Sequence, residues 1–277
     1  MKKILVPTDF SEKSKAAFLF AIQLASQDNY KLTFLHVLHI PTPIAWNVVR
    51  IDEYEKGQII AAEARLNIFV ENVYAGLNIP LSNVECIVKS SLFPEAVIGE
   101  YAEKNLFDFI CISTRGAGTL HRILGTNTGN LINHSAIPVI AVPHLYKTTA
   151  ITSILYASDL DHYEKEISRV IAFAKPLKAT LELLHLTTVL ENTAELMDIE
   201  KAVAKIDAYN VEFSLIPRDP SESLITDIET AIEKTKPSMM VMFTEQNRSW
   251  IDKIFLSSKS AEYSFDAKVP LLAFNKS

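Results

Sequence analysis

The sequence predicts an α/β protein made of two tandem domains, each built on a parallel sheet. Short, almost continuous apolar segments alternate with longer amphipathic ones, and this is the pattern of β-α-β units whose strands are covered on both faces. Four strand-like segments also recur in the same order in the second half of the chain. With 277 residues, the chain is long enough for two domains of ordinary size.

The elements of the first half follow from apolar periodicity and from residues that begin or end helices. Ser11 is suited to cap a helix, Pro94 suits a first helical turn, and Gly76 is placed to end a long helical segment. We expect strands at 3–8, 32–38, 84–89, 107–113 and 137–142, and helices at 12–26, 51–76, 94–104 and 127–135.

The second half is a shorter copy of the first. The run KILVPTD becomes SILYASD, which places Asp159 where the first copy has Asp9, and LTFLHV becomes LELLHL, which pairs His185 with His36. The four segments recur at offsets of 150, 149, 130 and 132 residues, so the second copy has lost about 20 residues. We therefore expect domains at 1–146 and 150–277, joined without a long linker.

Composition excludes several classes of protein. The net charge of −6 and the pI near 5.7 argue against a surface that binds nucleic acid in bulk. No apolar run approaches the ~20 residues of a membrane helix, and the first residues do not have the pattern of a signal peptide. Cys86 and Cys111 lie in apolar runs, as expected for core thiols in the cytoplasm. The histidines show no metal-binding spacing, and no nucleophile–base pair is recognisable, so we predict no metal site and no catalytic residue.

The glycines point to one segment. All seven lie within the first 129 residues, and several fall in CISTRGAGTLHRILGTNTGN, residues 111–130, between a predicted strand and a predicted helix. A glycine-rich loop that leads into a helix N-terminus exposes backbone N–H groups to an anion such as a phosphate. Neither the Walker nor the Rossmann glycine pattern is present, and a tight glycine turn without a ligand is the alternative reading.

Two segments resemble the universal stress protein family. The opening KKILVPTDFSEKSKAAF is similar to the start of its domains, and residues 112–143 resemble its closing loop, helix and strand. The resemblance covers the first copy throughout and the second more faintly, so the chain is similar to the tandem form. It implies five-stranded parallel sheets of order 3-2-1-4-5 with helices on both faces. In that order Asp9 and the loop at 113–126 meet where the strand order reverses, the usual ligand crevice of open α/β sheets.

The resemblance also implies a site for ATP or AMP, with or without Mg²⁺, in the first copy. Ser113 stands where the family's motif G-x2-G-x9-G-[ST] begins with glycine, Gly116 matches the second glycine, and the spacer has eight residues instead of nine. An intact fold with an empty site therefore stays an alternative. The expected binding residues are Pro7, Thr8, Asp9, Val37, Ile112, Ser113, Arg115, Gly116, Gly125, Thr126 and Asn127.

The second copy has no glycine in this segment. The motif spacing there falls on Thr244, Asn247, Ser257 and Ser258, so we expect no nucleotide and a structural or interaction role. The implied function is a stress-response regulatory protein, and a nucleotide-free scaffold or a slow ATPase are the alternatives. The fifth strands, 137–142 and 269–274, are expected to pair within the chain as a pseudo-dimer. The sequence leaves open whether two chains form a homodimer, and which protein partner binds.

Overall fold

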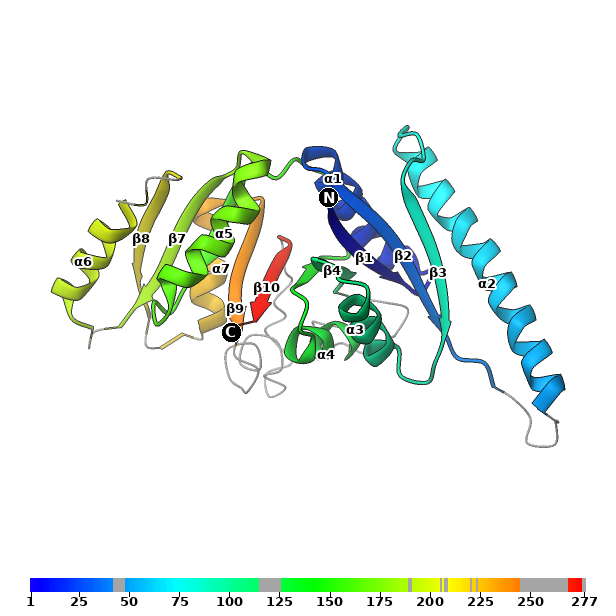
Figure 1. The fold of residues 1–277 in the computed structure, drawn as a ribbon. Helices are drawn as coiled ribbons and strands as arrows, with labels where there is room; N and C mark the ends of the chain where they lie inside the picture. Colours follow the sequence, from blue (N-terminus) through cyan, green and yellow to red (C-terminus); the bar gives the residue numbers. More distant parts are fainter. Residues whose placement is uncertain are drawn as a thin grey trace. The chain divides into compact units, whose positions relative to one another are not determined.

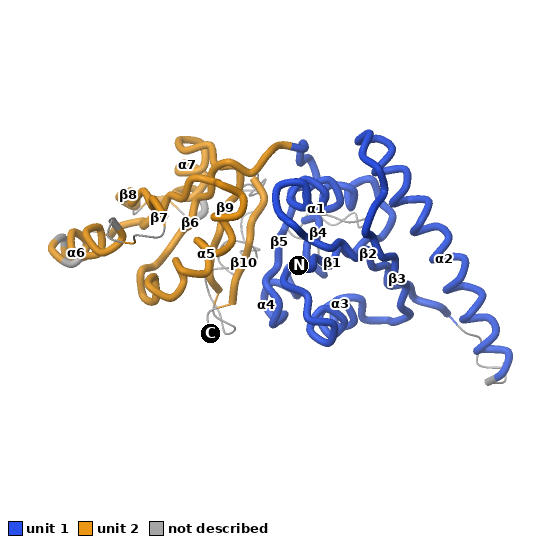
Figure 2. Tube along the Cα trace, turned by 45° about the horizontal axis from the view of Figure 1, so that its top comes forward, with its two compact units in different colours: residues 1–148 blue, residues 149–277 orange. Residues whose placement is uncertain are grey.

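The computed structural model divides into two compact units, residues 1–148 and residues 149–277 (Figure 2). It describes residues 1–41, 48–114, 126–188, 191–204, 206, 209–219, 221–222, 224–244 and 269–275. Each unit is an open α/β sheet with helices packed on it (Figure 1).

Unit 1 has five parallel strands in the order β3-β2-β1-β4-β5, as the resemblance implies. Right-handed crossovers place α1 and α2 on one face of the sheet and α3 and α4 on the other, and the helices of each pair contact one another. The strands are β1 (Lys2–Thr8), β2 (Tyr30–Leu38), β3 (Val84–Ser90), β4 (Phe109–Ser113) and β5 (Val139–Val142). The helices are η1 (Glu12–Ser14), α1 (Lys15–Gln27), α2 (Val48–Gly76), α3 (Pro94–Lys104) and α4 (Thr126–His134).

Unit 2 repeats this topology with its strands in the order β8-β7-β6-β9-β10, again all parallel. The predicted fold class is therefore confirmed for both copies. The strands are β6 (Ser153–Ala157), β7 (Thr180–Thr187), β8 (Val211–Pro217), β9 (Met239–Thr244) and β10 (Leu271–Asn275). The helices are α5 (Tyr163–Leu177), α6 (Thr193–Ala204) and α7 (Leu224–Thr235).

The helix ends show where local patterns decide the structure. Pro94 is the first residue of α3, because its missing N–H costs nothing in the first turn. Ser11 is a cap as expected, but it caps the short 3₁₀ turn η1, and α1 begins only at Lys15. Gly76 is the last residue of α2, yet the left-handed residue beyond it is Asn78, with φ of 55°.

The core of unit 1 lies on both sides of buried strands β1 and β4. On the α1 face an aromatic cluster joins the helices to the sheet. Phe18 stacks on Phe34 with ring centroids 4.4 Å apart, and Phe69 of α2 meets the edge of Phe18 at 5.3 Å. The carboxyl end of β1, which carries the candidate site, therefore lies beside a packed aromatic cluster.

Candidate functional site

The chain turns sharply where β1 ends. Phe10 adopts the left-handed conformation, with φ of 62°, which is uncommon for a bulky residue. The turn is held by side chains: the Phe10 N–H donates to Thr8 Oγ1 at 3.0 Å, and the Ser11 N–H donates to Asp9 Oδ1 at 3.0 Å. Ser14 Oγ donates to the Ser11 carbonyl, so the Thr8 hydroxyl donates to Ser14 across 2.9 Å. The Asp9 side chain is left on the exposed side of this turn.

The ladder between β1 and β4 ends before the carboxyl ends of these two strands. β1 stays paired with β2 along its whole length, as far as Thr8 opposite His36. With β4, in contrast, the paired residues of the described chain are only Ile4 and Leu5. Pro7 lies just beyond that ladder, and proline has no N–H to donate to a neighbouring strand. The ladder therefore ends near the point where the strand order reverses, which is the usual ligand position in open α/β sheets.

The end of β4 is tied to three other elements. Ser113 Oγ donates to the Lys13 carbonyl at 2.8 Å, which fixes β4 to the turn before α1. Thr128 of α4 donates its hydroxyl to the Ser113 carbonyl at 3.0 Å, and the Thr114 N–H donates to the Val142 carbonyl at 2.8 Å. These bonds hold the N-terminal turn of α4 beside the end of β4, where its N–H groups favour an anion.

The predicted site residues differ in how far the chain buries them. Pro7, Thr8, Ile112 and Ser113 are buried, so their side chains serve the fold and only their backbone can face a ligand. The exposed or half-exposed residues are Asp9, Val37 and Asn127. Thr126 begins α4. The loop residues Arg115, Gly116 and Gly125 lie outside the described residues, and so do Asn247, Ser257 and Ser258 of the second copy.

Sequence reasoning missed a cluster around Phe10. The His36 ring lies 4.1 Å from the Phe10 ring, and the guanidinium of Arg65 lies over the same ring at 4.4 Å. His36 Nδ1 is 2.8 Å from the Thr8 carbonyl, an acceptor, so this nitrogen carries the proton. Burial lowers the pKa of His36 below its ordinary value, and the nearby positive charge of Arg65 lowers it further. A neutral His36 therefore supports the turn from the β2 side.

Unit 2 keeps the turn but has a longer ladder beside it. The Leu160 N–H donates to Ser158 Oγ at 3.1 Å, the Asp161 N–H donates to Asp159 Oδ1 at 3.2 Å, and Leu160 is left-handed like Phe10. The ladder between β6 and β9, however, runs from Ile154 to Ala157, the last residue of β6. Ala157 stands where unit 1 has Pro7, so the donor that unit 1 lacks is present here.

The register also corrects an alignment between the two copies. The β1–β4 ladder starts at Ile4–Phe109, and the β6–β9 ladder starts at Ile154–Met239. Ser113 of unit 1 therefore corresponds to Phe243 of unit 2, one residue before Thr244. The Phe243 ring stacks on Phe274 with centroids 5.0 Å apart. A large apolar side chain therefore replaces the small hydroxyl of unit 1.

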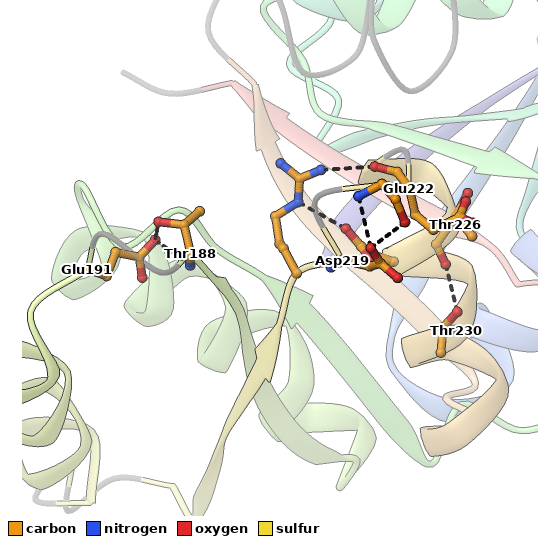
Figure 3. A network of polar contacts seen from close by, with 9 residues as sticks. Thr188, Glu191, Asp219, Glu222, Thr226 and Thr230 are labelled. Carbon is orange, nitrogen blue, oxygen red and sulfur yellow. Dashed lines mark hydrogen bonds and ion pairs between the residues drawn. The ribbon is translucent and has the colours of Figure 1, made fainter.

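The carboxyl ends of β7 and β8 in unit 2 carry a different polar network (Figure 3). Glu191 accepts from the N–H and the hydroxyl of Thr188, both at 3.1 Å, and from His185 Nε2 at 2.7 Å. Burial raises the pKa of Glu191, but the hydrogen bonds from His185 and Thr188 outweigh it and hold this pKa below its ordinary value. The carboxylate thus fastens the segment after β7.

A second part of this network joins β8 to α7 (Figure 3). Arg218 Nε donates to Asp227 at 2.9 Å, and Asp219 accepts from the Ser221 hydroxyl at 2.6 Å. Each of these charged groups therefore already has a hydrogen-bond partner within unit 2. Within the described parts of the chain, no group of three or more His, Cys, Asp or Glu side chains is arranged to hold a metal ion. None of the described helices is long and apolar enough to cross a membrane.

Two parallel α/β sheets of order 3-2-1-4-5, each with a hydroxyl-Asp turn after its first strand, define a tandem of open-sheet α/β domains. The sequence model of the universal stress protein family matches residues 1–143, and the chain belongs to this family. No curated protein sequence matches the chain significantly.

Solved structures support the tandem fold. A universal stress protein from Archaeoglobus fulgidus DSM 4304 has 17% identity and a TM-score of 0.71, and the match covers 99% of this chain and 98% of that one. A universal stress protein from Pseudomonas aeruginosa UCBPP-PA14 has 15% identity and a TM-score of 0.58, with 99% and 93% covered. A universal stress protein in complex with cAMP matches 53% of this chain, with 98% of its own chain covered, at 20% identity. Its TM-score of 0.38 is too low to bear on a ligand of this protein.

Proposed function

We propose that this universal stress protein binds one adenine nucleotide, ATP or AMP, in unit 1, and that unit 2 does not bind one in the same way. In this proposal nucleotide occupancy changes the surface that the protein presents to a partner during the stress response. The observation that carries it is the difference in strand pairing: the β1–β4 ladder ends at Leu5, before Pro7, whereas the β6–β9 ladder runs through Ala157.

The end of the β1–β4 ladder lies between two features that suit a nucleotide. On one side the exposed carboxylate of Asp9 is held by the Ser11 N–H, and a carboxylate accepts hydrogen bonds from ribose hydroxyls. On the other side α4 begins at Thr126, where backbone N–H groups and the helix dipole favour phosphate. Like charges keep Asp9 away from the phosphates unless a Mg²⁺ ion lies between them.

The remaining roles follow from the burial of each residue. Pro7, Thr8, Ile112 and Ser113 would contribute backbone groups and the walls of the crevice. Val37, half-exposed at the end of β2, would pack on the base. In the loop, Arg115, Gly116 and Gly125 would complete the phosphate site, with the hydroxyl of Thr126 and the backbone of Asn127. These assignments extend the sequence resemblance. The serine at position 113 is compatible with them, because its side chain is buried and its hydroxyl donates to the Lys13 carbonyl.

The remaining parts of the proposal concern organisation. We propose the domain limits 1–146 for the nucleotide-binding copy and 150–277 for the degenerate copy. Cytoplasmic location is supported by the two free thiols, Cys86 and Cys111. Burial raises the pKa of Cys86 to about 11, which keeps it an unreactive thiol. No described constellation supports catalysis, so ATP turnover is not part of the proposal.

The test compares equivalent carboxylates in the two units. Asp9→Ala and Asp159→Ala remove the same side chain from the same kind of turn, and equilibrium dialysis with labelled ATP measures the result. We expect Asp9→Ala to weaken binding at least about tenfold, the effect of losing one charged hydrogen-bonding group. Asp159→Ala should leave affinity unchanged. Equal affinities of both variants and the wild type would place the ligand elsewhere, and no binding by the wild type would favour the scaffold.

A further inference from the structure

Helix α2 has apolar residues on two faces. One face is buried against the sheet and carries Leu66, Val70 and Val73. On the other face Val49 is 67% exposed, Ile60 66% and Ile68 57%. A helix that is apolar on both sides is normally covered on both sides. Among the other described helices, only α6 exposes a large apolar side chain, Met197.

The exposed apolar residues lie along one line of the helix, which the carboxylates of Glu53 and Glu71 interrupt and which we call the outer stripe. Its positions follow each other in steps of 4, 4 and 3 residues, a repeat of 11 that stays on one side of an almost straight helix. The smallest residues of the stripe lie near its middle, where two helix backbones can approach closely. All its side chains are exposed: Val49, Glu53, Gly57, Ile60, Ala64, Ile68, Glu71 and Ala75. At 1.5 Å per residue it is about 39 Å long.

We propose that the outer stripe is a homodimer interface, in which α2 of one chain packs antiparallel on α2 of a second copy. The helix carries three basic and five acidic residues, so its net charge of −2 argues against an anionic lipid surface. The charges that border the stripe complement one another when two copies run in opposite directions. Gly57 of one chain then faces Ala64 of the other.

In this register Arg50 lies level with Glu71 of the second copy, and Lys56 lies two residues, about 3 Å along the axis, from the level of Glu63. Lys56 and Glu63 are seven residues apart and so lie on the same side of the stripe. Within its own chain Lys56 pairs with Asp52 at 2.6 Å, but both side chains are exposed, and such a pair is easily shared with a new partner. A shift that placed Glu53 opposite Glu71 would bring like charges together, so the charges also select the register.

The first test is the oligomeric state of the full chain, measured by sedimentation equilibrium. We expect a dimer whose dissociation constant rises about 100-fold or more in Ile60→Glu, because the change buries a charge at the centre of the interface. The matched control is Leu106→Glu, since Leu106 is 78% exposed and lies outside α2. Circular dichroism of each variant checks the fold. A wild-type monomer at every concentration, or a dimer that Ile60→Glu leaves intact, would overturn the proposal.

The second test checks direction and register with single cysteines. Chains with Gly57→Cys mixed with chains with Ala64→Cys should form a disulfide-linked dimer under mild oxidation. Either variant alone places its two copies of the new cysteine about 10 Å apart along the axis, beyond the ~7 Å that a disulfide allows between Cα atoms. Linkage in the mixture alone supports the antiparallel register. Linkage in a single variant, or in neither experiment, would overturn it.

Discussion

The turn after the first strand of each unit is the part of the molecule whose energetics can be worked out most fully. In unit 1 the buried hydroxyl of Thr8 donates to Ser14 and accepts from the Phe10 N–H. Thr8→Val keeps the shape of the side chain and removes both bonds. A lost bond costs about 0.5–1.5 kcal/mol, and a donor left unsatisfied costs about 1–3 kcal/mol, so we expect a loss of roughly 2–3 kcal/mol in the free energy of unfolding.

Unit 2 provides the matched variant. Ser158 Oγ accepts from the Leu160 N–H at 3.1 Å and bonds the Tyr156 hydroxyl at 3.0 Å, so Ser158→Ala should destabilise the protein by a similar amount. Urea denaturation followed by circular dichroism measures both losses. Their effects on ATP affinity should differ, because only Thr8 supports the carboxylate turn of the proposed site. We expect about a tenfold loss for Thr8→Val and none for Ser158→Ala.

One outcome would refute this reasoning: a Thr8→Val protein that is destabilised as expected but binds ATP like the wild type. The turn would then be a structural device common to both units, with no part in recognition. If instead Thr8→Val cost no stability, the hydrogen bonds assigned to its hydroxyl would be wrong.

The remaining predictions concern other buried polar groups. Tyr156→Phe removes the hydroxyl that donates to the buried carboxyl group of Glu166, and should cost about 1.5–3 kcal/mol of unfolding free energy in urea titrations, without changing ATP affinity. The pKa of His36 is lowered by folding, so the unfolded chain takes up the proton first. Stability should fall as the pH drops below about 6.5 toward that lower value. His36→Gln should reduce this loss, and an unchanged pH profile would contradict the assignment.

Much of the fold could be predicted from the sequence because its signals are local. Buried parallel strands are almost continuous apolar runs, and Pro94 marks a helix start without reference to the rest of the chain. Gly76 was less informative, because the residue that takes the left-handed conformation after α2 is Asn78. A glycine near a helix end permits such a turn but does not require it.

The site was harder to predict because its contacts join distant segments. The sequence identifies Ser113 as a serine in place of the motif's first glycine, but not that its hydroxyl donates to the carbonyl of Lys13, 100 residues earlier in the chain. Likewise Arg65 reaches Phe10 only because α2, which packs on β2 and β3, lies beside the turn that follows β1. Pro7 was visible in the sequence, yet its consequence depends on which strand lies beside it and on where that ladder ends.

The central claim is that one half of this chain binds an adenine nucleotide and the other half does not. Isothermal titration of the full chain with ATP and Mg²⁺, and separately with AMP, tests it most directly. The account predicts a single site per chain for at least one of these nucleotides. No heat at millimolar nucleotide, or two sites per chain, would contradict it.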